Sequence, residues 1–250
     1  SVEENMEDLK TVVLEKGAVV GIAFDGDGDR MAAVTHQGNF VGGDHLLAIF
    51  SEKILSAQEG AMIVGDIKCS SALKEYVENR SGKMVISRTG SVFVRDAMEE
   101  TGAVVGGELS CHFFFKDRYF GFDDGIYAAL RLIEILVESD ASLEELVDAI
   151  PKRVSSPEFR IECLQDGKKI IEKVLEKVQF LENAEIISID GIAIRICEGW
   201  SLIRLSNTQP VLSIRFESET VEGLNYCKNL VIDLLKEWYN DDMLRMIFYK

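Results

Sequence analysis

Three aspartates alternate with two glycines in residues 25–30, which read DGDGDR. The carboxylates of Asp25, Asp27 and Asp29 repel one another unless a cation lies among them, and the glycines allow a tight loop that aims all three inward. Hard oxygen ligands of this kind suit Mg²⁺. The three aspartates are therefore the predicted metal ligands.

Arg30 directly follows these aspartates. A carboxylate-bound Mg²⁺ is a Lewis acid for a phosphate oxygen, and Arg30 could form charge-assisted hydrogen bonds to the same group, which indicates phosphoryl transfer. Arg30 could instead only neutralise the loop as an ion-pair partner. A solvated acidic turn and a phosphatase-type aspartate nucleophile also stay open, whereas an EF-hand is disfavoured because Arg30 and His36 stand where that loop needs Gly and Glu.

A second polar group lies in residues 106–112, which read GGELSCH. Glu108 can accept hydrogen bonds from vicinal sugar hydroxyls, and Ser110 can both donate and accept them. A histidine side chain can gain or lose a proton near neutral pH, so His112 could act as a general acid or base. A buried structural histidine beside the aromatic run 113–115 is the alternative for His112.

A third group, residues 204–210 with the sequence RLSNTQP, lies between two predicted strands. One guanidinium, two hydroxyls and an amide, together with backbone N–H groups, could hold a phosphate monoester, although a simple capped turn is the alternative. Weaker candidates follow two other predicted strands, at an edge where a parallel sheet presents ligands. The candidates in residues 204–210 are Arg204, Ser206, Asn207 and Thr208, and the weaker candidates are Lys68, Thr89 and Gly90.

The elements that must position these groups follow from the apolar patterns. Strands at 18–24 and 31–34 predict a hairpin around the acidic loop, after a helix that ends at Gly17. Strands then alternate with helices, which predicts an α/β domain whose mixed, mostly parallel sheet carries helices on both faces. The predicted strands are 61–65, 84–87 and 103–106, and the predicted helices are 44–56, 70–79, 92–101 and 124–138, with a short one near 142.

The pattern changes at Pro151, where we expect a domain boundary. Beyond it, strands cluster between two helices, which predicts a smaller α+β domain. The predicted strands are 158–163 and short ones near 186, 192, 201 and 211, and the predicted helices are 167–178 and 221–238.

Composition limits the function classes. The 250 residues carry a formal net charge of −16, which opposes non-specific binding to nucleic acid or to an anionic membrane. No apolar stretch approaches the roughly 20 residues of a spanning helix, and the first residues show no export signal. Five cysteines lack any Cys-x-x-Cys pair, so we expect a protein of the reducing cytoplasm.

Taken in order, these segments resemble the α-D-phosphohexomutase family, most closely its bacterial phosphomannomutase/phosphoglucomutase type. The motifs that carry the resemblance span most of the chain and leave residues 1–17 and 152–200 thinly covered. They are GIAFDGDGDR (21–30), DIKCS (66–70), SRTGS (87–91), GGELSCHFFFKDRYFGFDDGIYAALRLIEIL (106–136) and RLSNTQPVLSIRFE (204–217).

The resemblance implies three parts of a four-domain enzyme: the end of the metal-binding second domain (1–39), the sugar-binding third domain (40–151) and the phosphate-binding fourth domain (152–250). It implies that the three aspartates bind Mg²⁺, that Arg30 supports the phosphoryl group and that His112 transfers a proton. The implied ligands of the sugar phosphate are Glu108, Ser110, Arg204, Ser206, Asn207 and Thr208, with Lys68, Thr89 and Gly90 lining the cleft and Lys68 as a further catalytic candidate.

Three departures from the family pattern matter. Cys111 stands where the sugar loop usually carries Gly, and Ser91 stands where many members carry His. The family's phosphorylated serine, in a Ser-His-Asn-Pro loop of the first domain, has no counterpart, and no Ser-His pair occurs in the 250 residues.

The implied activity is interconversion of hexose 6-phosphate and hexose 1-phosphate, of mannose or glucose, through a phosphoserine and a hexose 1,6-bisphosphate. Because the serine is missing, we expect this chain to bind Mg²⁺ and sugar phosphate without turning over substrate. A Mg²⁺-dependent phosphatase and a non-catalytic sugar-phosphate-binding module are the alternatives.

Overall fold

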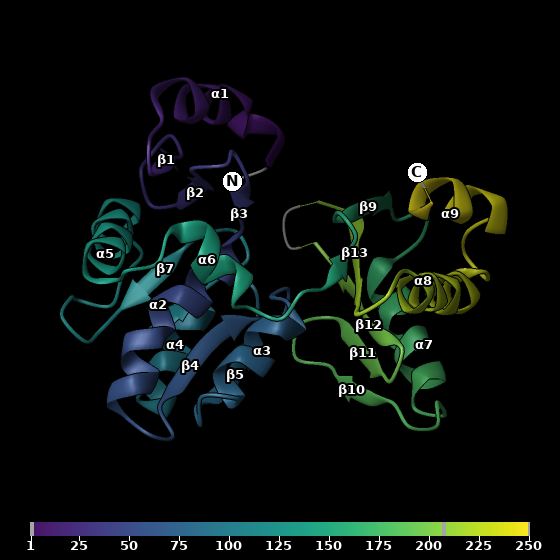
Figure 1. Cartoon of the computed structure of the whole chain (residues 1–250). Helices are drawn as coiled ribbons and strands as arrows, with labels where there is room; N and C mark the ends of the chain where they lie inside the picture. Colours follow the sequence, from purple (N-terminus) through teal and green to yellow (C-terminus); the bar gives the residue numbers. More distant parts are fainter. Residues whose placement is uncertain (1–2, 207–208, 250) are drawn as a thin grey trace. The chain divides into compact units, whose positions relative to one another are not determined.

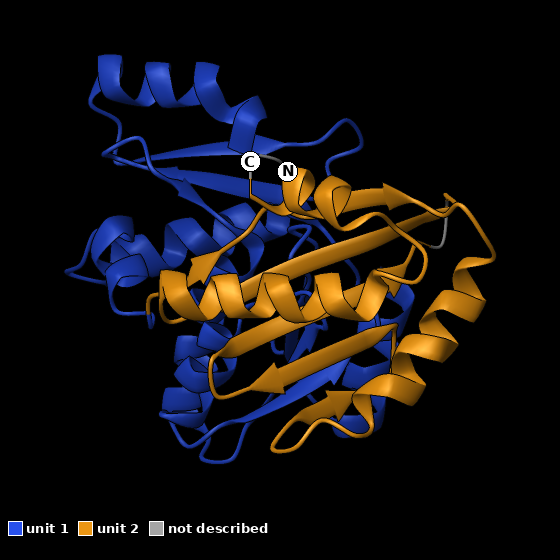
Figure 2. Ribbon diagram, turned by 90° about the vertical axis from the view of Figure 1, so that its right-hand side faces the viewer, with its two compact units in different colours: residues 1–151 blue, residues 152–250 orange. Residues whose placement is uncertain are grey.

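The computed structural model describes residues 3–206 and 209–249, and it divides the chain into two compact units, residues 1–151 and residues 152–250 (Figure 2). Each unit has a sheet and a hydrophobic core of its own. Within the described residues, no helix combines the length and the apolar character that crossing a membrane requires.

Unit 1 begins with a 3₁₀ turn, η1 (Glu3–Met6), and helix α1 (Glu7–Lys16). Gly17 ends α1 in the left-handed conformation, with φ of 61°, as its position after the apolar pattern predicts. Three antiparallel strands follow in the order β1-β2-β3, and the pairing of β1 with β2 confirms the predicted hairpin around the acidic loop. The strands are β1 (Val20–Phe24), β2 (Met31–Thr35) and β3 (Phe40–Val41).

A second sheet of unit 1 has the strand order β5-β4-β6-β7. Figure 1 labels β4, β5 and β7 of this sheet. Strand β4 is parallel to both β5 and β6, and β7 runs antiparallel to β6, so the predicted mixed, mostly parallel sheet is confirmed. Its strands are β4 (Met62–Asp66), β5 (Lys83–Ser87), β6 (Val105–Gly107) and β7 (Phe113–Phe115). The helices of unit 1 after β3 are α2 (Gly43–Ala57), α3 (Ser71–Glu78), α4 (Ser91–Thr101), α5 (Gly125–Glu138) and α6 (Leu143–Asp148).

Helices cover both faces of this sheet, as predicted. Val64 packs with Val94 of α4 on one face, whereas its neighbour Ile63 belongs to the larger core that includes α2 and α5. The sequence did not reveal β7, because both faces of its three consecutive phenylalanines are buried and no alternation marks a strand.

Unit 2 contains an antiparallel sheet in the order β10-β11-β12-β13-β8, with β9 also paired to β13. This is the predicted smaller α+β domain; α7 has the predicted bounds, α8 ends three residues early, and β8 and α9 were not predicted. Its strands are β8 (Val154–Ser155), β9 (Phe159–Glu162), β10 (Glu185–Ile187), β11 (Ile192–Ile196), β12 (Gly199–Leu205) and β13 (Val211–Ser218). Its helices are α7 (Gly167–Val178), α8 (Val221–Leu235) and α9 (Asp241–Phe248).

Candidate functional site

The acidic loop joins β1 to β2, and carboxylate oxygens of its three aspartates lie within 4.8 Å of one another. Arg30 donates to Asp25 twice, from its backbone N–H to Oδ1 at 3.1 Å and from Nε to Oδ2 at 2.6 Å. Burial opposes ionisation of Asp25, but these hydrogen bonds hold its pKa well below the usual value. Arg30 therefore forms an ion pair within the loop, and its predicted contact with a phosphoryl group stays a prediction.

Asp29 has the opposite electrostatic environment. Burial raises the pKa of Asp29, and the charges of Asp25 and Asp27 act in the same direction, while His112 opposes them. Its Oδ1 is buried without a hydrogen-bond partner among the described residues. Three close carboxylates and an unsatisfied oxygen fit a divalent cation, which would relieve both the repulsion and the unpaired acceptor.

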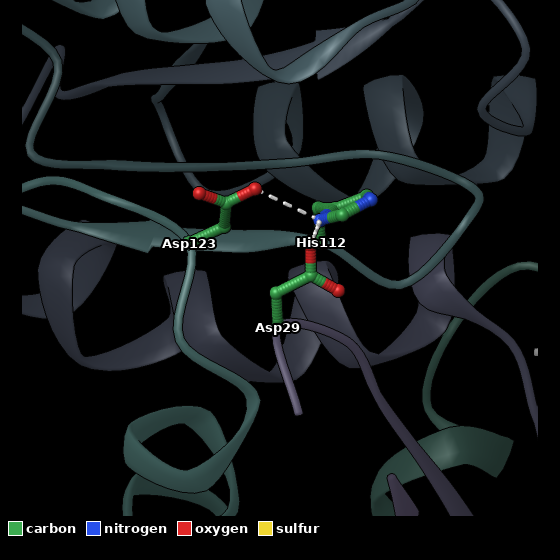
Figure 3. Close-up of side chains that lie close together, drawn as sticks. All are labelled: Asp29, His112 and Asp123. Carbon is green, nitrogen blue, oxygen red and sulfur yellow. Dashed lines mark ion pairs between the residues drawn. The ribbon is translucent and has the colours of Figure 1, made fainter. Parts of the chain in front are cut away.

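A second group of ligand-type side chains shares Asp29 with the first (Figure 3). Nδ1 of His112 lies 3.0 Å from Oδ2 of Asp123 and 3.8 Å from Oδ2 of Asp29, although neither contact has hydrogen-bond geometry. The sequence analysis did not single out Asp123. Its only signal was the position in the motif FGFDDG, directly before the helix cap Asp124.

Backbone contacts join the acidic loop to the loop that carries Glu108, Ser110 and His112. Arg30 and His112 form an isolated antiparallel bridge, and Met31 N–H donates to the Cys111 carbonyl at 3.2 Å. The structure thus brings two of the sequence-predicted groups together within unit 1.

The start of α5 also rests on the acidic loop, where Gly125 N–H donates to the Gly28 carbonyl at 3.0 Å. A Cβ at Gly125 would lie 2.6 Å from the Arg30 carbonyl oxygen, so only glycine permits this approach.

Residues 108–111 form a tight turn, in which Cys111 N–H donates to the Glu108 carbonyl at 2.9 Å and Glu108 N–H donates to the His112 carbonyl at 3.0 Å. Cys111 is fully buried and has φ of 73°, a left-handed conformation that favours glycine. The turn therefore holds Cys111 in a backbone conformation that glycine adopts without strain, at a cost in strain.

The side chain of Asp66, at the end of β4, is hydrogen-bonded to the turns that follow the three parallel strands β4, β5 and β6. Its Oδ1 accepts from Leu109 N–H and Cys69 Sγ, each at 3.1 Å, and its Oδ2 accepts from Thr89 Oγ1 at 3.2 Å. The side chain is only 2% exposed. Asp66 is the first residue of the motif DIKCS, but the sequence alone indicated no role for it.

Glu108 is buried near Asp66, and its Oε1 accepts a hydrogen bond from Gly90 N–H at 2.7 Å. Burial, followed by the charge of Asp66, raises the pKa of Glu108, and the Gly90 hydrogen bond, His112 and Lys68 oppose that rise. Lys68, Thr89 and Ser110 are half-buried in the turns around this carboxylate. Their predicted contacts with a substrate stay predictions.

In unit 2, Arg204 lies near the end of β12 and is buried. Its Nε and one terminal nitrogen contact the Asp190 carboxylate at 3.2 and 3.1 Å, which leaves less of the guanidinium for a phosphate than the sequence suggested. Ser206 N–H donates to the Val211 carbonyl at 2.9 Å, which closes the turn between β12 and β13. Asn207 and Thr208, the other predicted phosphate ligands, lie outside the described residues.

Two family models match the chain. The model for phosphoglucomutase/phosphomannomutase alpha/beta/alpha domain III matches residues 42–154, and the model for the phosphoglucomutase/phosphomannomutase C-terminal domain matches residues 157–234.

Similar proteins agree with the family models. A phosphomannomutase/phosphoglucomutase of Pseudomonas putida is 41% identical over 227 residues, which are 91% of this chain and 49% of the relative. A phosphoglucomutase of Neisseria gonorrhoeae is 40% identical over 228 residues, which are 90% of this chain and 49% of the relative. A phosphoglucomutase/phosphomannomutase family protein from Burkholderia thailandensis, known from a crystal structure, is 37% identical in sequence. The two structures match with a TM-score of 0.87, over 94% of this chain and 50% of that protein's chain.

The chain spans about half the length of these relatives, and its residues 42–154 and 157–234 match the models of the third and the C-terminal domains. The loops that carry residues 25–30 and 108–112 lie on a fold shared with this solved member of the family. The chain therefore belongs to the phosphoglucomutase/phosphomannomutase family, of which it carries domain III and the C-terminal domain.

Proposed function

We propose that this chain is the metal-binding and sugar-phosphate-binding half of a phosphohexomutase. The complete enzyme would interconvert hexose 6-phosphate and hexose 1-phosphate, of mannose or glucose, through a hexose 1,6-bisphosphate. The phosphorylated serine would come from a domain outside these 250 residues. The observation that carries the proposal is the direct contact between the acidic loop and the sugar loop, made by the Arg30–His112 bridge and the Met31–Cys111 hydrogen bond.

Within this site, Asp25, Asp27 and Asp29 would hold Mg²⁺. When bound, Mg²⁺ supplies Lewis-acid stabilisation of phosphoryl oxygens. Arg30 keeps Asp25 ionised through two hydrogen bonds, and its remaining guanidinium N–H groups are the proposed donors to the transferring phosphoryl group.

His112 is the proposed group that moves a proton at the sugar hydroxyl. Its Nδ1 is next to Asp123, so Nε2 is the nitrogen left to face a substrate. Glu108 and Ser110, on the adjoining turn, are the proposed partners of the sugar hydroxyls, and Asp66 fixes that turn by accepting from Leu109 N–H. Lys68, Thr89 and Gly90 would complete the walls of the cleft.

In unit 2, Arg204 and the turn that follows it are the proposed clamp for the phosphate that does not transfer. Asp190 would orient the guanidinium in the same way that a carboxylate orients a metal-binding histidine. The proposed division of the chain is the end of the metal-binding domain at 1–39, the sugar-binding domain at 40–151 and the phosphate-binding domain at 152–250.

Calorimetric titration of the purified chain tests the proposal. Mg²⁺ should bind, and Asp27→Asn should weaken binding by about tenfold or more, because one of three carboxylate ligands is lost. The matched control is Asp96→Asn, an exposed position on α4. Equal Mg²⁺ affinity of the two variants would contradict the metal assignment.

A second titration, with glucose 1-phosphate or mannose 1-phosphate in the presence of Mg²⁺, tests the sugar site. Arg204→Lys should weaken binding, because lysine cannot reproduce a guanidinium fork, while Arg195→Lys on β11 serves as the control. A coupled assay should detect no mutase turnover by the chain alone. A beryllium fluoride adduct on Asp25 or Asp27 would point instead to a phosphatase.

A further inference from the structure

Two carboxylates and an imidazole meet in unit 1, at Asp29, His112 and Asp123 (Figure 3). One ligand-type atom of each side chain lies within 4.8 Å of the other two. Only Asp29 belongs to the acidic loop, so this group offers a nitrogen donor that the three aspartates of the loop lack. Imidazole nitrogen together with carboxylate oxygen suits a transition metal such as Zn²⁺, whereas Mg²⁺ prefers oxygen ligands alone.

The separations of these atoms agree with a shared cation. Nδ1 of His112 lies 3.0 Å from Oδ2 of Asp123 and 3.8 Å from Oδ2 of Asp29. Bonds of about 2.0–2.2 Å to a tetrahedral ion place two of its ligand atoms about 3.4 Å apart. The two measured distances lie on either side of that value.

A hydrogen bond does not account for the same contacts. Neither approach to Nδ1 has hydrogen-bond geometry, and this buried nitrogen has no hydrogen-bond partner in residues 3–206 and 209–249. Oδ1 of Asp29 is a second buried atom of the group without a partner in that part of the chain. Buried polar atoms are nearly always satisfied, and a cation would satisfy the nitrogen and the carboxylate together.

The backbone fixes the three side chains before any ion binds. Arg30, directly after Asp29, forms an isolated β-bridge with His112, and Phe114 forms another with Asp123. The three side chains are 36%, 17% and 20% exposed, in the order Asp29, His112, Asp123, so the group is sheltered and still open to an ion from solvent. Ligands held on paired backbone segments need little rearrangement to bind.

Asp29 faces two groups of ligands with its two oxygens. Its Oδ2 faces His112, whereas its Oδ1 lies 3.7 Å from Nε of Arg30, on the side of the acidic loop. One ion in the loop leaves the carboxylate of Asp123 and the imidazole without a metal. Enzymes with two-metal sites hold their ions about 3.5–4 Å apart, a spacing that one bridging carboxylate can span.

We propose that Asp29, His112 and Asp123 form a second cation site, which takes Zn²⁺ or a similar transition metal and shares Asp29 with the Mg²⁺ site of the acidic loop. The ligand atoms are Oδ2 of Asp29, Nδ1 of His112 and Oδ2 of Asp123. Three protein ligands leave the fourth position of a tetrahedral ion to water.

Calorimetric titration with Zn²⁺ tests the site in the Asp27→Asn background, in which the loop site is weakened. Addition of Asp123→Asn or of His112→Gln should lower the Zn²⁺ affinity at least tenfold, because each removes one of three ligands. Addition of Asp96→Asn, on the exposed side of α4, should leave it unchanged. Circular dichroism checks that every variant is folded. Equal Zn²⁺ affinity of the three double variants would overturn the proposal.

Nitrogen-15 spectra of the histidine rings identify the ligating atom. The chain has three histidines, His36, His45 and His112, and a His→Gln variant of each assigns its signals. Zn²⁺ should move the Nδ1 signal of His112. Movement confined to His36 or His45, or a shift of Nε2 in place of Nδ1, would overturn the proposal.

The optical spectrum of the Co²⁺ form separates this site from the cysteines, of which Cys197 is exposed. A site of nitrogen and oxygen ligands gives no thiolate-to-cobalt charge-transfer band. Such a band, present in the unmodified chain and lost in Cys197→Ser, would assign the metal to a thiol and would overturn the proposal.

The two metal sites can fail separately, because the inference does not depend on mutase activity. Asp123→Asn should retain the Mg²⁺ affinity of the unmodified chain while its Zn²⁺ affinity falls. A chain that binds Zn²⁺ through His112 but does not bind Mg²⁺ would contradict the proposed function alone. Equal losses of Mg²⁺ and Zn²⁺ affinity in Asp123→Asn would mean that one site binds both ions, which would overturn the second site.

Discussion

At the scale of single residues, Cys111 shows how a residue other than glycine can occupy a left-handed position in a tight turn. Its φ of 73° is a conformation in which a Cβ costs about 1–2 kcal/mol. Because the sulfhydryl is fully buried, the residue compensates part of this cost through packing. The strain and the packing can be separated by comparing two substitutions that both remove the sulfur.

Cys111→Gly is expected to be about 1 kcal/mol more stable to urea unfolding than Cys111→Ala, because only alanine retains the strained Cβ. The control is Cys227, buried within α8, where the order should reverse because glycine weakens a helix interior. The same order at both positions would contradict the strain at Cys111.

Glu108 predicts a pH dependence of stability. Its pKa is raised in the folded state, so the folded chain holds this proton more tightly than the unfolded chain and loses stability as pH rises from the unfolded value of 4.5 through the folded one. Glu108→Gln removes the ionisation but keeps an oxygen for Gly90 N–H.

The free energy of unfolding of E108Q, relative to the unmodified chain, should therefore increase as pH rises above the unfolded value of 4.5. Urea titrations at several pH values measure it. A difference that stays flat or falls with pH would show that the buried carboxylate is stabilised by its surroundings after all.

At the scale of elements, the candidate site depends on close backbone approaches between helix starts and loops. The first turn of α2 makes such an approach at Gly43, where a Cβ would lie 2.4 Å from the Glu108 carbonyl oxygen. Gly125 does the same for α5 and the acidic loop. These glycines allow the start of α2 to pack against the Glu108 loop and the start of α5 to pack against the acidic loop.

Gly125→Ala should destabilise the chain by about 1–3 kcal/mol and weaken Mg²⁺ binding, because its Cβ would force Gly28 and Arg30 away from α5. Gly26→Ala is the matched control in the same loop, since a Cβ there meets nothing within 4 Å. Thermal unfolding and calorimetry measure both effects. Equal stability of the two variants would mean that the loop moves freely to accommodate the methyl group.

At the scale of the whole molecule, the two units have separate sheets and separate cores. Residues 152–250 form an antiparallel sheet covered by helices, with phenylalanines 159, 216 and 248 packed ring against ring. A unit with its own core should fold without the rest of the chain.

The fragment 152–250 is therefore expected to unfold cooperatively, with the helix and strand content that unit 2 has in the full chain. Circular dichroism during urea titration is the measurement. A fragment with no sigmoidal transition would show that unit 2 needs unit 1 for its stability.

Much of this architecture could be predicted from local patterns. Helix α7 has the bounds that its apolar spacing predicted, and the hairpin around the acidic loop follows from two apolar runs separated by glycines and aspartates. Short elements such as β3 and β8 could not be predicted, because two residues carry no period. The final helix α9 was missed as well, although its pattern is amphipathic.

The sequence by itself determined which residue types could hold a metal and a sugar phosphate, and in which loops they lie. Only the tertiary structure decided the partners: Asp66 against the Leu109 turn, Asp123 beside His112 and Asp190 against Arg204. The physical reason is that periodicity and turn chemistry are local properties of the chain, whereas these pairs join segments 11 to 43 residues apart. Such contacts form only when strands and helices have packed.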